Sequence, residues 1–239
     1  DDAAGEDSAF AIIPALSKQI AQDLEDAFED CMINGDTAAT HQDDIANWNI
    51  RERWGASGLG GSSDHRRLFL GFRAAALDKT SFVDYGGAAL TFANFMSAVS
   101  QMGELAVGNK VCVVSPECLI ANFLELSEVV TLEKFGPQAT VLTGQLASLA
   151  GIPIVMSRFM GADLEDDGKF LGSGSKNKTG FVIFNPDSYS QYVRRQITIE
   201  SDKDIASGAI QLVSTMRAVM DSPDAASVKN VVYGYDLPI

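Results

Sequence analysis

One long amphipathic helix near the start of the chain constrains the fold more than any other feature. Acidic residues at positions 23, 25, 26, 29 and 30 cover one side of this segment. Asn34-Gly35-Asp36 follows it, and Gly or Asn readily adopts the left-handed conformation that ends a helix. The pattern predicts about five to six helical turns. The apolar face recurs at spacings of three and four, at Ile13, Leu16, Ile20, Leu24, Phe28, Cys31 and Met32.

The rest of the chain mixes helix and strand signals without the regular alternation of a doubly wound sheet. Ser115-Pro116 after an apolar run is typical of a helix start, with Ser as the cap and Pro in the first turn. Residues 37–89 are rich in turns and are expected to be irregular, and residues 161–179 form a polar loop. The sequence therefore predicts an α+β fold with a helix over 90–106 and strands over 111–114, 181–184, 196–200, 209–220 and 227–233. The stretch 150–156 is expected to be a tight turn that leads into a short strand.

Composition excludes several classes of function. The chain has 239 residues, and its 18 Lys and Arg against 32 Asp and Glu give a net charge of −14. Binding to nucleic acid or to an anionic membrane needs clustered positive charge, which is absent, and no apolar run approaches the length of a bilayer span. Three scattered cysteines are too few for a disulfide framework. The chain opens on acidic residues without an initiator Met, so we expect a processed product or a fragment.

The search for catalytic residues gives one weak constellation. There are two histidines, His41 and His65. Ser63, Asp64 and His65 are adjacent in sequence, but a catalytic triad is defined by its geometry in space, and no Gly-x-Ser-x-Gly elbow is present. A histidine in a loop is more often exposed to solvent than catalytic.

Other candidate motifs also favour structural interpretations. Cys31, Cys112 and Cys118 lack a zinc spacing and are expected to be small buried apolar residues. The glycine-rich segment 55–61 has no Lys after it, which the phosphate-binding loop requires. We therefore assign no catalytic, cofactor-binding or metal-binding residues. A cluster of acidic residues could bind calcium but is more typical of a solvated loop: Asp163, Glu165, Asp166 and Asp167.

Read in order, these segments resemble the HK97-fold major capsid proteins of tailed double-stranded DNA bacteriophages. The resemblance starts at the helix ending Cys31-Met-Ile-Asn-Gly-Asp36 and continues through Gly71-Phe72-Arg-Ala-Ala and the helix 90–106. Val111-Cys-Val-Val-Ser-Pro-Glu-Cys-Leu119 is similar to a strand and helix start of the family. Gly151-Ile-Pro-Ile-Val155 and the strands between 196 and 233 follow in the family's order. Each motif is loose, and their order carries the resemblance.

The resemblance implies a structural subunit that self-assembles into the pentamers and hexamers of an icosahedral shell around double-stranded DNA, without sequence-specific binding. It implies a peripheral domain, with the long "spine" helix, over residues 1–36 and 190–222, and an axial domain over 37–189 and 223–239. The loop 163–179 is the candidate for the capsomer centre. Portal, scaffold or decoration proteins are further expected partners. The expected location is the virion, after assembly in the host cytoplasm, with no membrane and no enzymatic activity.

One departure from the family pattern affects assembly. Family members carry an N-terminal arm and an E-loop before the spine helix, and both are expected to be missing here. The chain alone is therefore expected to be a monomer or a small ring, and no crosslinking residue is assigned. Three alternatives remain open: an encapsulin-like nanocompartment shell, an α+β enzyme with a dispersed site near His65 and Asp64, and an adaptor that binds other proteins.

Overall fold

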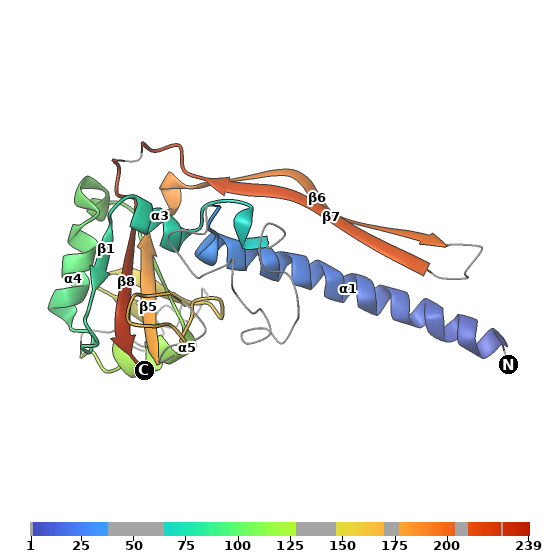
Figure 1. The fold of residues 1–239 in the computed structure, drawn as a ribbon, viewed down its shortest axis with the longest axis horizontal. Coiled ribbons are helices and arrows are strands. Elements are labelled where there is room, and N and C mark those ends of the chain that lie inside the picture. Colours follow the sequence, from blue (N-terminus) through green and yellow to red (C-terminus); the bar gives the residue numbers. More distant parts are fainter. Residues whose placement is uncertain (1, 38–64, 128–146, 170–176, 204–209, 226) are drawn as a thin grey trace.

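The structure is a computed structural model that describes residues 2–37, 65–127, 147–169, 177–203, 210–225 and 227–239. It has a core built on a six-stranded sheet and an arm that projects from it (Figure 1). The arm consists of the helix α1 (Asp2–Asn34) and a two-stranded ribbon of β6 (Ser190–Lys203) and β7 (Ile210–Asp221). The N-terminus lies at the far tip of the arm, and the C-terminus lies in the core. The predicted α+β fold is confirmed.

The core sheet is mixed, with the strand order β1-β8-β5-β2-β4-β3. Its central strand β5 pairs antiparallel with both β8 and β2, whereas β1 pairs parallel with β8 and β2 pairs parallel with β4. The strands are β1 (Phe82–Asp84), β2 (Val111–Val114), β3 (Ala147–Leu149), β4 (Ile152–Met156), β5 (Lys178–Phe184) and β8 (Val231–Pro238).

Helices cover the sheet on both faces. Short helical segments alternate with the strands: η1 (His65–Arg67), α3 (Phe72–Asp78), α4 (Phe92–Ser100), η2 (Gly103–Val107), α5 (Pro116–Cys118), the π-helical η3 (Leu119–Phe123) and η6 (Pro186–Ser188). Phe95 of α4 and Phe123 of η3 pack with Phe181 on one face, with ring centroids 5.6 to 5.8 Å apart. The end of α1 and α3 belong to the apolar cluster on the other face.

Two-sided burial explains the apolar runs in the central strands. Along β5, Phe181 and Ile183 belong to the cluster with α4 and η3, and Val182 belongs to the cluster with α1 and α3. Cys112 and Val113 of β2 divide between the two clusters in the same way. Because successive side chains point to opposite faces, a strand covered on both sides needs apolar residues at every position.

Some of the helix and strand bounds predicted from the sequence are confirmed, and others are wrong. The helix α1 ends where Asn34-Gly35 predicted, but it begins at Asp2, and its 33 residues exceed the five to six turns expected. Ser115 caps α5 by accepting from the Cys118 amide at 3.0 Å. The helix predicted over 90–106 is broken: α4 ends at Ser100, and a separate 3₁₀ segment, η2, begins at Gly103, whose φ of +57° does not fit a continuous α-helix. The regular helix α3 contradicts the expectation of an irregular segment there.

Two strand boundaries were also wrong. The strand predicted over 196–200 starts at Ser190, because pairing with β7 extends it through a charged stretch that shows no alternation. The last strand, predicted over 227–233, spans Val231–Pro238. Gly234 there lies against Phe181 and Tyr85, and a Cβ on Gly234 would come within 2.9 Å of both rings. This close approach places a glycine inside a strand, where the local sequence suggests a turn.

A close contact between two backbone segments joins the arm to the core. The amide of Gly71 donates to the carbonyl of Gly35 at 2.8 Å, immediately after α1 and immediately before α3. A Cβ on Gly35 would lie 2.4 Å from the carbonyl oxygens of Cys31 and Phe69, and one on Gly71 would lie 2.5 Å from the Gly35 nitrogen. Both positions therefore require glycine for space rather than for an unusual φ.

This contact gives the first prediction. We expect Gly71→Ala to lower the free energy of unfolding by about 2 to 3 kcal/mol, because the new Cβ meets backbone atoms that cannot rotate away. Gly86→Ala is the control: Gly86 has φ +59° and open space around it, so the cost is only about 1 kcal/mol of backbone strain. Urea unfolding of both variants measures the difference, and equal losses would show that the contact tolerates a side chain.

Candidate assembly surfaces

The end of α1 carries a buried polar network that fixes the arm. Asn34 donates through Nδ2 to Asp30 Oδ1 at 2.6 Å and to the carbonyl of Phe159 at 2.7 Å. Arg73 of α3 donates through Nη1 to Asn34 Oδ1 at 2.7 Å and through Nη2 to the carbonyl of Gly168. Asp30, Asn34 and Arg73 are each at most 2% exposed. Their bonds join α1, α3 and the loop 157–169 into one unit.

The network extends to the core sheet and to η1. The Tyr233 hydroxyl donates to the Gly168 carbonyl at 2.8 Å, and the Arg73 guanidinium lies 5.2 Å from the centroid of the Tyr233 ring. His65 Nε2 lies 2.7 Å from Asp30 Oδ2. The network therefore holds a buried carboxylate and a buried guanidinium on either side of Asn34, an arrangement that fixes one orientation of the helix relative to the sheet.

A second cluster anchors the ribbon. Asn230, just before β8, donates through Nδ2 to Ser222 Oγ at 2.7 Å and to Asp224 Oδ2 at 2.9 Å. Its Oδ1 accepts from the Tyr189 hydroxyl at 3.1 Å and from Lys79 Nζ at 2.8 Å. Burial lowers the pKa of Lys79. Because Tyr189 precedes β6 and Ser222 follows β7, one asparagine holds both strands of the ribbon to the core at the ribbon's base.

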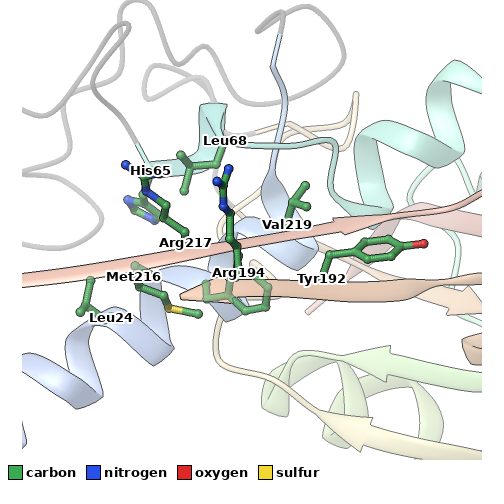
Figure 2. A pocket seen from close by; sticks show the side chains of 11 residues that line it. Leu24, His65, Leu68, Tyr192, Arg194, Met216, Arg217 and Val219 are labelled. Carbon is green, nitrogen blue, oxygen red and sulfur yellow. The ribbon is translucent and has the colours of Figure 1, made fainter. Parts of the chain in front are cut away.

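An open apolar groove runs between α1, η1 and the ribbon, with a volume of about 440 Å³ (Figure 2). Exposed side chains line it: Leu68 is 65% exposed and Tyr192 is 56% exposed. Large contiguous apolar surfaces are uncommon on monomers and mark interfaces. The groove is lined by Leu24, Ala27, Phe28, His65, Leu68, Tyr192, Arg194, Met216, Arg217, Ala218 and Val219.

A smaller apolar surface lies on the core beside the C-terminus. Ile120 and Leu124, at and just after η3, are 66% and 47% exposed, and Ile239 is 51% exposed. Asn122 donates to the carbonyl of Pro238 at 2.8 Å, which places η3 against the end of β8. The core therefore presents an apolar surface of its own, apart from the groove of the arm.

Of the catalytic candidates from the sequence, the structure describes only His65. His65 lines the groove and contacts Asp30. His41, Ser63, Asp64 and the glycine-rich segment 55–61 lie outside the described residues. Sequence reasoning missed the Asp30–His65 pair, because the two residues are 35 positions apart and nothing local connects them.

The acidic cluster is partly neutralised by lysines. Lys178 Nζ lies 2.7 Å from Asp236 Oδ1 and 3.5 Å from Asp166 Oδ1, and the hydrogen bond to Asp236 raises the pKa of Lys178. Lys169 lies 3.8 Å from Asp167. Of the predicted loop 163–179, the residues 170–176 lie outside the described residues. Within the ranges that the structure describes, no group of three or more His, Cys, Asp or Glu could hold a metal ion.

All three cysteines are buried and unpaired by disulfides, as predicted. Burial raises the pKa of Cys112 well above its usual value and that of Cys118 to about 12. Such thiols are inert apolar residues rather than nucleophiles. Searched for membrane spans, the described helices yield none that is both long and apolar enough.

Of three comparisons with known proteins, only the one with solved structures finds similar chains. No family model matches this chain, and no curated protein matches it either. Among solved structures, it is similar to a chain of the satellite phage P4 procapsid including size determination (Sid) protein, with a TM-score of 0.52 and 10% identity over 94% of this chain and 67% of that chain. This similarity shows a shared fold, so the predicted resemblance to phage capsid proteins is confirmed at the level of the fold.

Two further structures are also phage proteins. One is the asymmetric unit of the bacteriophage PhiM1 mature capsid, with a TM-score of 0.46 and 16% identity over 95% of this chain and 64% of that chain. The other comes from Mycobacterium phage Che8, with a TM-score of 0.40 and 20% identity over 67% of this chain and 58% of that chain. The chain thus spans 58% to 67% of the length of these three chains.

The polar network generates the second prediction. We expect Arg73→Met to lower the free energy of unfolding by about 3 kcal/mol, because it leaves Asn34 Oδ1 without its donor in a buried site and removes one of the two donors to the Gly168 carbonyl. Arg158→Met is the matched control, since Arg158 is 61% exposed and pairs with Asp26 at the surface, where the loss is below about 1 kcal/mol. Chemical denaturation measures both, and similar losses would contradict the role of the network.

The cysteines generate the third prediction. Unfolded thiols ionise from about pH 9, whereas Cys118 in the folded protein keeps its proton to about 12. Above pH 9 the unfolded state therefore binds fewer protons than the folded state. The free energy of unfolding must then fall as the pH rises through this range. We expect Cys118→Ala to flatten this fall between pH 9 and 11 in urea titrations. Parallel pH profiles for Cys118→Ala and wild type would be the contrary result.

Proposed function

We propose that this chain is a structural subunit of an icosahedral phage capsid, which self-assembles into pentamers and hexamers that enclose packaged double-stranded DNA. The observation that carries the proposal is the two-part architecture, an arm joined to a mixed-sheet core, whose fold is matched over 94% of the chain in the comparison with the P4 procapsid chain. A shell subunit needs several different surfaces rather than one enclosed pocket, because contacts in a closed ring join unlike faces.

The arm and the core fit the two domains of such a subunit. We assign residues 1–36 and 190–222 to the peripheral domain, which contains α1 and the whole ribbon. Residues 37–189 and 223–239 form the axial domain, which contains the six strands of the core sheet. The loop 163–179, whose last two residues already begin β5, is assigned to the capsomer centre. Its residues 163–169 are held to the core through Gly168, whose carbonyl accepts from Arg73 and Tyr233.

The net negative charge of the chain supports a shell that encloses DNA without binding it tightly. The chain carries a net charge of −14, so it repels a polyanion at long range. Packaged DNA then moves beneath the shell without tight adsorption. In this account the chain has no enzymatic role, resides in the virion after assembly in the host cytoplasm, and meets portal, scaffold or decoration proteins as partners. Many modest contacts acting together stabilise such a lattice.

The fourth prediction tests the shell role. Particles from cells that produce this chain, purified on a density gradient and analysed by quantitative mass spectrometry, should contain it as their most abundant protein. Nuclease treatment before lysis of the particles should leave their DNA intact, because a closed shell protects it. Absence of the chain from DNA-protecting particles would contradict the proposal.

A further inference from the structure

The groove along the arm has a second feature besides its apolar lining. Arg194 and Arg217 lie at the groove on neighbouring strands, where the register pairs Val193 with Ala218 and Arg195 with Arg217. Figure 2 shows both side chains on the same side of the ribbon as Leu68. Arg194 has no register partner of its own, but its guanidinium shares one groove with that of Arg217, and like charges held close together repel each other. A negatively charged partner at this place would remove that cost.

Neither arginine has an acidic partner in the described part of the chain. The neighbouring Arg195 lies 3.8 Å from Glu200, whereas no described residue forms an ion pair with Arg194 or Arg217. In a chain with 32 acidic and 18 basic residues, two exposed arginines at one groove form a local positive site in a negative molecule. Together with exposed Leu68 and Tyr192, they fit a segment that carries both carboxylates and apolar side chains.

The chain itself contains such a segment at the start of α1. Residues 1–7 include four acidic residues, and Phe10, Ile12 and Ile13 follow. From residue 2 on, this segment forms the first turns of α1, at the far end of the arm (Figure 1). The groove lies beside Leu24 and Phe28, which is roughly 30 Å further along the same helix at 1.5 Å per residue. A straight helix cannot bring its own first turns to that groove, so the contact must join two copies.

We propose that the acidic first turns of α1 in one subunit dock into the groove between α1 and the ribbon of the next subunit, with Arg194 and Arg217 as the charged anchors. The contact is heterologous, because the tip of one arm meets the groove of another, and it therefore propagates into rings or lattices. The inference rests on the proposed function, since it names a surface by which shell subunits meet.

A charge-swap experiment tests this contact on the full chain. One variant carries Arg194→Glu and Arg217→Glu, and the other carries Glu6→Arg and Asp7→Arg. Sedimentation velocity at low ionic strength and up to about 1 mM measures self-association, where close charge pairs have their largest effect. Each variant alone should associate about tenfold more weakly than wild type. An equimolar mixture should recover wild-type association, because each groove then meets an end of opposite charge.

The controls separate the contact from general charge and stability effects. Lys110→Glu changes charge on the core, away from the groove, and should leave association unchanged. Thermal unfolding of all variants should match wild type, because the contact is between copies. Three results would each overturn the contact. The variant with Arg194→Glu and Arg217→Glu could associate as strongly as wild type, or the mixture could fail to recover wild-type association. The third is a wild type that stays monomeric at 1 mM. The shell role itself is read separately, from the composition of the DNA-protecting particles.

Discussion

The contact of Gly35 with Gly71 is the constraint on which the rest of the structure depends. It brings the end of α1 against the start of α3 with the two backbones in hydrogen-bond contact at 2.8 Å. Only at that separation does Arg73 reach Asn34 and Gly168, and only then does Asn34 reach the Phe159 carbonyl. A side chain at either glycine would separate these partners and leave a buried guanidinium unpaired.

This constraint couples the arm to the core as one body. The helix is fixed at its end by the Arg73 network, and both strands of the ribbon are fixed at its base by Asn230. Phe28 lines the apolar groove beside the ribbon and packs against Phe69, with ring centroids 5.4 Å apart and the rings tilted by 56°. Both anchors lie at the core end of the arm, so they fix the direction in which the arm leaves the core. One fixed direction suits a lattice of identical copies.

Local patterns predicted the elements whose causes are local. The period of α1, its end at Asn34-Gly35 and the capping of α5 by Ser115 all depend on residues within a few positions of one another. The helix α3, the early start of β6 at Ser190 and the late β8 depend on partners far along the chain, so their local sequences mislead. The Asp30–His65 pair and the Gly35–Gly71 contact were missed for the same reason.

The order of segments along the chain predicted the family fold better than any single motif did, because that order reflects the long-range strand pairing that local patterns lack.

The most direct test of the account is a cryo-electron microscopy map of particles that contain this chain, with the chain traced into the density. The account predicts an icosahedral lattice in which α1 and the ribbon project from the core as they do in Figure 1, with the Gly35–Gly71 contact intact in every subunit. A particle whose lattice density does not fit this chain, or a subunit whose arm has separated from its core, would contradict it.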